Sequence, residues 1–202
     1  MSDPLNPSAR NVDQGALRAA GVSSRHASLF ARGQPLQRTT SLRTAQEFRA
    51  THAGWCLLLS GPHGVGKTLA AEWLIWQALA SGEISKEGVR RLWSPLEVLD
   101  ASTDTALRQT LHKARLLVLD DLGSEAGPRS PAFVWALREI VNARWREERR
   151  TVFTTNLTGR ALQARYGPHV IDRLRDGGRC ITAAGANLRL LKPAAEISAV
   201  PQ

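Results

Sequence analysis

The most informative stretch of this sequence is Gly61-Pro62-His63-Gly64-Val65-Gly66-Lys67-Thr68. It fits the phosphate-binding pattern G-x-x-x-x-G-K-[ST], whose glycines let backbone N–H groups face a polyphosphate. The apolar run at 55–59 predicts a buried strand before it, and residues 68–80 predict a helix after it. This order places a helix N-terminus on the phosphates, which an ordinary glycine-rich turn would not do. The sequence therefore predicts a nucleotide site, with Lys67 on the β- and γ-phosphates and Thr68 on Mg²⁺.

Composition limits the chain to one domain, or to one domain with a short appendage. Its 202 residues are 43% hydrophobic and 22% charged, which suffices for a sizeable core. The sequence has neither an apolar run of about eighteen residues nor a basic N-terminal segment followed by an apolar one. Cys56 and Cys180 each fall in a predicted strand, and no Cys/His spacing suggests zinc. We expect a cytoplasmic protein with reduced core cysteines and no membrane contact.

The charge of the chain favours an anionic partner. The formal net charge is +9, from 27 Lys and Arg against 18 Asp and Glu. Such an excess favours contact with phosphate backbones, and an affinity of that kind falls steeply with salt. An arginine-rich proteome, in which surface charges are arginines without any nucleic-acid contact, is the alternative explanation.

Strands and helices are predicted to alternate along the core. Besides the strand near Cys56, strands are predicted at 89–93, 116–119, 151–154 and 180–182, and helices at 103–114, from 130 to about 150, and in short pieces from 159 to 176. The unbroken apolar run at 116–119 is typical of a strand buried on both faces of a parallel sheet. The predicted fold class is therefore α/β, a parallel sheet flanked by helices on both faces, with ligand bound at the carboxyl ends of the strands.

The segments outside this core are short. Residues 1–20 predict a mobile N-terminal arm because they show little apolar periodicity. Residues 21–50 form a pre-core segment, in which a short helix at 41–50 presents Leu42, Ala45 and Phe48 on one side. The nucleotide-binding core would span 51–191, and residues 192–202 would form a C-terminal tail. The six tryptophans are expected to pack in the core rather than to stack on bases.

Two carboxylates follow the apolar run at 116–119. Asp120 and Asp121 give this segment the form of a Walker B motif. Asp120 would hold Mg²⁺ through water, and Asp121 would polarise the attacking water as general base. Asp121 is one methylene shorter than the Glu common at this position, which argues against fast hydrolysis, and Glu125 is a second candidate base. The alternative is a solvated Asp-Asp turn before Gly123.

A polar residue ends the next predicted strand as well. Asn156 follows Thr154 and Thr155. At the carboxyl edge of the sheet it would lie between the phosphate loop and the acidic strand end, where it could orient water or contact the γ-phosphate. An ordinary Asn in a strand-to-helix turn is the alternative.

These three motifs come in the order and approximate spacing of AAA+ ATPases, a class of phosphate-loop NTPase. A segment at 166–175, with Asp172-Arg173-Leu174, and a closing Gly185-x-x-x-Arg189 narrow the resemblance. Over residues 21–191 the chain resembles the clade of DnaC-type helicase loaders and IstB-type transposition helpers. The resemblance implies an ATPase that uses ATP and Mg²⁺, with a lid domain that is minimal or absent.

The resemblance also implies roles for individual residues. Asn156 matches the sensor I position, and Arg189 matches sensor II, which acts on the nucleotide of its own subunit. Arg173 matches the arginine finger, which reaches the nucleotide of a neighbouring subunit, with Arg175 as a substitute. The arm before the core is too short for a separate helicase-binding domain, and Leu188 stands where an aromatic residue often precedes the arginine.

We therefore expect a self-assembling, slowly hydrolysing ATPase that acts on single-stranded DNA or on a replicative helicase, as a DnaC-like loader does. A regulator of a transposase, a nucleotide-binding adaptor with negligible turnover, and a small-molecule kinase remain the alternatives. The Asp-Asp strand end followed by an Asn strand end argues against the kinase.

Overall fold

The fold is built on one parallel sheet. A computed structural model describes residues 12–51, 54–92, 97–124 and 131–188. Its five strands lie in the order β2-β3-β4-β1-β5, and every neighbouring pair is parallel. The strands are β1 (Cys56–Ser60), β2 (Val89–Leu92), β3 (Leu116–Leu122), β4 (Thr151–Thr155) and β5 (Arg179–Thr182). The predicted α/β class and all the predicted strands are confirmed.

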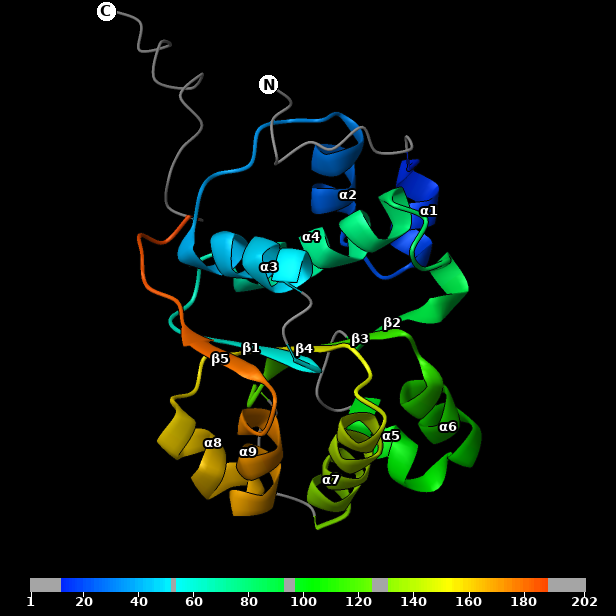
Figure 1. Ribbon diagram of the computed structural model, residues 1–202, viewed down its shortest axis with the longest axis vertical. Helices are drawn as coiled ribbons and strands as arrows, with labels where there is room; N and C mark the ends of the chain where they lie inside the picture. The colour runs from blue at the N-terminus through cyan, green and yellow to red at the C-terminus, as the bar shows by residue number, and fades with distance from the viewer. Residues whose placement is uncertain (1–11, 52–53, 93–96, 125–130, 189–202) are drawn as a thin grey trace, which may run out of the picture.

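Helices cover both faces of this sheet. Figure 1 shows α1 to α4 on one face and α5 to α9 on the other. The first group is α1 (Gln14–Ala19), α2 (Ser24–Ala31), α3 (Thr40–Thr51) and α4 (Lys67–Ala80). The second group is α5 (Glu97–Thr103), α6 (Thr105–Lys113), α7 (Pro131–Arg146), α8 (Gly159–Tyr166) and α9 (Pro168–Arg175).

Each face of the sheet carries its own apolar core. Successive side chains of a strand point to opposite faces, so Leu57 and Leu59 pack with α1 to α4, whereas Cys56 and Leu58 pack with the opposite helices. All five residues of β1 are buried. This burial on both faces explains why the strands read as continuous apolar runs rather than as alternating patterns. It also fixes the strand ends, from which the polar residues of the candidate site project.

Part of the predicted mobile arm is helical and packed, while residues 1–11 of that arm lie outside the described part. Residues 14–19 form α1, whose Leu17 is fully buried. Asp13 caps this helix, because its side chain accepts a hydrogen bond from the Ala16 N–H at 2.9 Å. In α2, the Phe30 ring stacks on Trp76 of α4 at a centroid distance of 5.2 Å. Both helices are therefore part of the packed domain, although each is too short to show a clear helical period in the sequence.

The other helices follow the predictions, with some differences. Leu42, Ala45 and Phe48 of α3 are buried together as predicted. Helix α5 was not predicted, and β3 extends three residues beyond the predicted strand, through both aspartates to Leu122. Trp135 of α7 is 47% exposed, so the expectation of core packing is wrong for this tryptophan.

Neither cysteine is paired. Cys56 is buried, and burial, with a smaller contribution from Cys180, raises the pKa of its thiol. Cys180 is exposed, so the expectation of a core position is wrong for this residue.

In the described part of the chain, no helix is both long enough and apolar enough to span a bilayer. The expectation about a lid concerns residues after β5, of which 189–202 lie outside the described part.

Candidate nucleotide-binding site

The phosphate loop connects β1 to α4 as predicted. Gly61 and Gly66 have φ angles of +139° and +84°, which side chains rarely adopt. At Gly61 a Cβ would also lie 2.3 Å from the carbonyl oxygen of Ala183. Gly66 is the N-cap of α4, so the helix begins directly at Lys67. The loop therefore has the tight backbone and the helix N-terminus that a polyphosphate site needs.

Lys67 is held over this loop. Its side chain is buried, with 7% of the residue exposed. The ammonium donates to the carbonyl oxygens of Gly61 at 2.8 Å and Pro62 at 2.6 Å, and to Asn156 Oδ1 at 2.9 Å. These bonds fix the positive charge at the carboxyl edge of the sheet, where parallel strands bind their ligands.

The two predicted magnesium ligands lie together. The Thr68 hydroxyl donates to Asp120 Oδ1 at 3.1 Å, and the Thr154 hydroxyl donates to the same oxygen at 2.5 Å. Asp120 is only 7% exposed. Hydroxyl and carboxylate oxygens are the ligands that Mg²⁺ prefers, so this pair fits the ion that the sequence implies. Thr154, which the sequence did not single out, orients the carboxylate from β4.

Asp121 lies beside Asn156, the predicted sensor residue. A register irregularity interrupts the β3–β4 ladder between Leu119 and Leu122, and Asp121 within it has a φ of +56°. Asp tolerates this left-handed conformation better than most residues. The Asp121 N–H donates to Thr154 Oγ1 at 2.8 Å, and its Oδ1 accepts from Asn156 Nδ2 at 2.6 Å. Asn156 therefore joins the candidate base Asp121 to Lys67. The predicted base and the predicted sensor thus belong to one hydrogen-bonded group.

Sequence reasoning missed Arg91 of β2. Its guanidinium is 1% exposed and forms an ion pair with Asp120 Oδ2 at 2.5 Å. Another nitrogen contacts Glu72 of α4 and donates to the Gly21 carbonyl at 2.8 Å. Burial alone would raise the pKa of Glu72, but the His26 hydrogen bond and the Arg91 charge together bring it below its usual value. The only signal in the sequence was a charged residue inside a short strand that the fold buries.

Other segments close over the phosphate loop. The Leu188 N–H donates to the Gly64 carbonyl at 2.9 Å, and the Ser41 hydroxyl of α3 donates to the Val65 carbonyl at 3.2 Å. The predicted closing motif thus reaches the loop through its last described residue, Leu188. Arg189 itself, like Glu125, lies outside the described residues.

The predicted arginine finger is not brought to this group. The Arg173 guanidinium lies 3.7 Å from the ring centroid of Trp145, near the end of α7. Helix α7 returns the chain to the amino end of β4, opposite to the strand ends that carry Asp121 and Asn156. Arg175 lines a pocket that includes Ser60 and Thr182, at the carboxyl ends of β1 and β5. Within one chain, then, Arg175 lies nearer than Arg173 to the carboxyl edge of the sheet.

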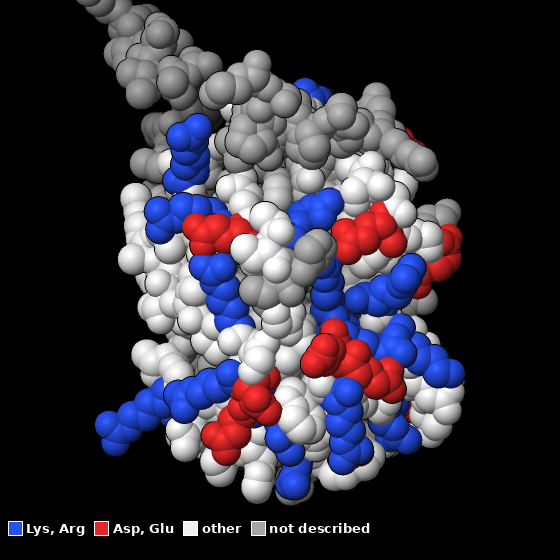
Figure 2. All heavy atoms as spheres, in the orientation of Figure 1, with Lys and Arg blue, Asp and Glu red and all other residues white. Residues whose placement is uncertain are grey.

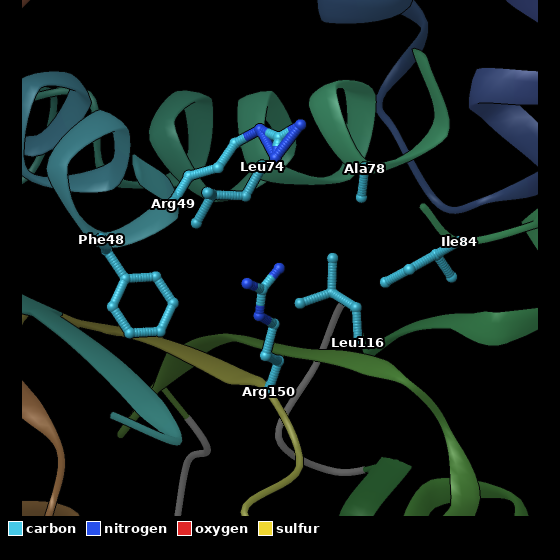
Figure 3. A pocket seen from close by; sticks show the side chains of 7 residues that line it. All are labelled: Phe48, Arg49, Leu74, Ala78, Ile84, Leu116 and Arg150. Carbon is cyan, nitrogen blue, oxygen red and sulfur yellow. The ribbon is translucent and has the colours of Figure 1, made fainter. Parts of the chain in front are cut away.

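A hollow separate from this site lies at the amino edge of the sheet, opposite to the carboxyl edge that carries the site. Figure 3 shows Arg150 rising from the sheet between Phe48 and Leu116. Leu116 begins β3 and Arg150 precedes β4, so the hollow lies at the amino ends of the strands. Glu83 pairs there with Arg150 at 2.6 Å and with Arg49 at 3.3 Å. The two arginines are thus part of structural ion pairs.

On the face that Figure 2 shows, the Lys and Arg side chains do not gather into one patch. Figure 2 shows Lys and Arg side chains interspersed with Asp and Glu over the face that Figure 1 presents. Several charges of the described residues are ion-paired, such as Arg149 with Glu147 at 2.5 Å. The contact with nucleic acid that the net charge favours therefore stays a prediction.

Comparison with known proteins shows the fold. No protein-family model and no curated protein sequence matches the chain. Among solved structures, the DnaC helicase loader is similar over 74% of this chain and 94% of its own, with a TM-score of 0.60 and 21% identity. DnaI is similar over 83% of this chain and 93% of its own, at a TM-score of 0.62 and 21% identity. The replication initiator DnaA, bound to AMPPCP and single-stranded DNA, is similar over 75% of this chain and 48% of its own, at a TM-score of 0.55 and 19% identity. The predicted resemblance is confirmed at the level of the fold.

Proposed function

We propose that this chain binds ATP with Mg²⁺, hydrolyses it slowly, and acts in DNA replication as a loader of a replicative helicase. The observation that carries the proposal is the connected polar group at the carboxyl edge of the sheet. There Lys67, Asn156 and Asp121 form one hydrogen-bonded chain, beside the Thr68–Asp120 pair. The fold shared with the DnaC helicase loader supports the loading role.

The residues divide the chemistry among themselves. The ammonium of Lys67 would leave the loop carbonyls for the β- and γ-phosphates, and the loop N–H groups would face the same anion. Thr68 and Asp120 would hold Mg²⁺, which when bound neutralises charge on the phosphates. Asp121 would accept the proton of the attacking water, while Asn156 keeps its carboxylate in place.

Self-association of the chain would complete the nucleotide site. An ATPase of this type that has only Lys67 and Mg²⁺ at the phosphates, and no second cationic side chain at the γ-phosphate, hydrolyses slowly, because charge that develops in the transition state is only partly neutralised. We propose that Arg173 supplies this cation to a neighbouring copy after leaving the Trp145 ring, and that Arg189 acts within its own subunit. Hydrolysis would then depend on self-association around single-stranded DNA or a helicase ring.

A Lys67→Ala variant tests the proposal. We expect calorimetry to show ATP affinity at least about tenfold lower, because a charge-assisted hydrogen bond to a phosphate contributes about 1.5–3 kcal/mol. Sedimentation and fluorescence anisotropy should show that ATP increases self-association and single-stranded DNA binding of the parent but not of the variant. The control is Lys113→Ala, which removes an exposed lysine of α6. A parent protein that takes up no ATP would contradict the whole proposal.

Capture of partners with and without ATP tests the loading role separately. We expect a replicative helicase to be retained with ATP. Retention of a transposase without a helicase would instead favour an IstB-like regulator.

A further inference from the structure

The buried ion pairs around Arg91 connect the metal side of the site to the N-terminal helices. Arg91 lies between two carboxylates, Asp120 on β3 and Glu72 on α4. Both partners and the guanidinium are at most 8% exposed at their side chains. Solvent therefore screens these charges weakly, and a change at one of them is felt by the others.

Asp120 divides its two oxygens between different tasks. Its Oδ1 accepts from the hydroxyls of Thr68 and Thr154, at 3.1 and 2.5 Å. Its Oδ2 accepts from Arg91 at 2.5 Å. Only the Oδ1 side thus faces the threonine that would share a cation. The Arg91 charge offsets the charge of the carboxylate on which the cation depends.

The N-terminal segment determines how Arg91 is held. The turn between α1 and α2 presents the Gly21 carbonyl to Arg91, and a Cβ at Gly21 would lie 2.8 Å from the Arg91 Cβ. Glu72, the second carboxylate, accepts from the Ser23 hydroxyl at 2.8 Å and contacts His26 Nδ1 at 2.5 Å. On the side away from Asp120, the α1–α2 segment therefore contacts Arg91 itself, through the Gly21 carbonyl, and also holds its partner Glu72.

We propose that Arg91 is a positioning residue that sets the strength of the magnesium site through Asp120, and that Glu72 and the α1–α2 segment limit its pull on that carboxylate. This inference rests on the proposed ATP and Mg²⁺ function. Arg91 binds Oδ2 while Thr68 and Thr154 hold Oδ1, and the Arg91 charge weakens cation binding at Asp120. Glu72 draws the guanidinium in the opposite direction.

Two substitutions have opposite expected effects, which distinguishes this role from a purely structural one. Arg91→Met removes the competing charge while Thr68 and Thr154 still hold Asp120, so Mg²⁺ should bind more tightly. Glu72→Gln removes the second carboxylate, so Arg91 acts more strongly on Asp120 and Mg²⁺ should bind more weakly. Simple loss of packing would weaken binding in both variants.

The measurement is the affinity for a fluorescent ATP analogue titrated with MgCl₂, against a sample containing EDTA. We expect the half-saturating Mg²⁺ concentration to fall at least about tenfold in Arg91→Met and to rise at least about tenfold in Glu72→Gln, because a weakly screened unit charge a few ångströms away changes the affinity for a cation by that factor or more. Arg49→Met is the matched control, because its ion pair with Glu83 lies at the other end of the sheet. Its half-saturating concentration should match that of the parent.

The possible results separate the proposed function from the role of Arg91. If the parent binds no analogue with or without Mg²⁺, the proposed function is wrong. If the parent binds it, but the two substitutions leave the Mg²⁺ dependence unchanged or shift it in the same direction, the role of Arg91 is wrong. Should Arg91→Met fail to fold by circular dichroism, Glu72→Gln still decides, since an unchanged Mg²⁺ dependence in that variant overturns the inference.

Discussion

Asp121 combines a special backbone with a candidate catalytic role. Its φ of +56° lies in the left-handed region, and Asn156 binds one of its oxygens at 2.6 Å. Among residues other than glycine, Asp and Asn adopt this backbone conformation most readily. A Glu at this position, which is common in the AAA+ ATPases that the sequence resembles, would here both add strain and extend past the Asn156 contact. The backbone at Asp121 thus gives a physical reason for the shorter acid.

An Asp121→Asn variant tests whether this acid is the general base. Asn keeps the left-handed backbone and an oxygen for Asn156, but it cannot take up a proton at neutral pH. We expect phosphate release to fall about a hundredfold or more, as for loss of a general base, while calorimetry shows an ATP affinity within a few-fold of the parent. Unchanged turnover would assign the proton transfer to another residue.

At the scale of single elements, Arg144 of α7 joins three parts of the fold. Its side chain is fully buried and is bonded entirely to neutral oxygens among the described contacts. Burial lowers the pKa of this guanidinium to about 9. The contacts tie the end of α6 to the start of β4. The acceptors are the carbonyls of Leu111 at 2.8 Å, His112 at 3.2 Å, Ala114 at 2.8 Å and Arg150 at 2.6 Å, and Thr151 Oγ1 at 2.7 Å.

An Arg144→Leu variant should therefore be strongly destabilised. It leaves several buried carbonyl oxygens without a donor, at about 1–3 kcal/mol for each one that water cannot reach. We expect urea unfolding to show a loss of at least about 3 kcal/mol at an unchanged m-value. Arg138→Leu, on an exposed position of the same helix, should stay within about 0.5 kcal/mol of the parent. Equal losses in the two variants would show that the Arg144 contacts do not hold these elements together.

The elements that could be predicted from the sequence are those that packing makes regular. β3 and α7 were predictable, because burial on both faces gives β3 an unbroken apolar run and burial on one side gives α7 an apolar stripe. Helix α1 was missed because six residues are too few to show a helical period. Tertiary contacts, which no local pattern records, hold that helix in place.

At the scale of the whole molecule, the phosphate loop and both strand ends were predictable, because parallel strands bring their carboxyl ends to one edge. Lys67, Asp121 and Asn156 meet there as one hydrogen-bonded group. Arg91 was not predictable, since its partners come from α4, from β3 and from the turn between α1 and α2, which are distant from it in the sequence. The sequence also could not show that Arg173 rests on Trp145, because a side chain's contact with a remote helix leaves no mark on local spacing.

The extent of the domain is testable through Leu17. If residues 1–20 were an arm, a substitution there would not affect stability. Leu17 is instead fully buried in the core that includes α4, the helix of the phosphate loop. We expect Leu17→Ala to lower the free energy of unfolding by about 2–5 kcal/mol in a single cooperative transition, as for other buried Leu to Ala changes. Arg18→Ala, at the exposed neighbouring position, is the control and should change it by less than about 0.5 kcal/mol. An unaltered midpoint in Leu17→Ala would separate α1 from the domain, and the support that the α1–α2 turn gives to Arg91 would then not contribute measurably to folding.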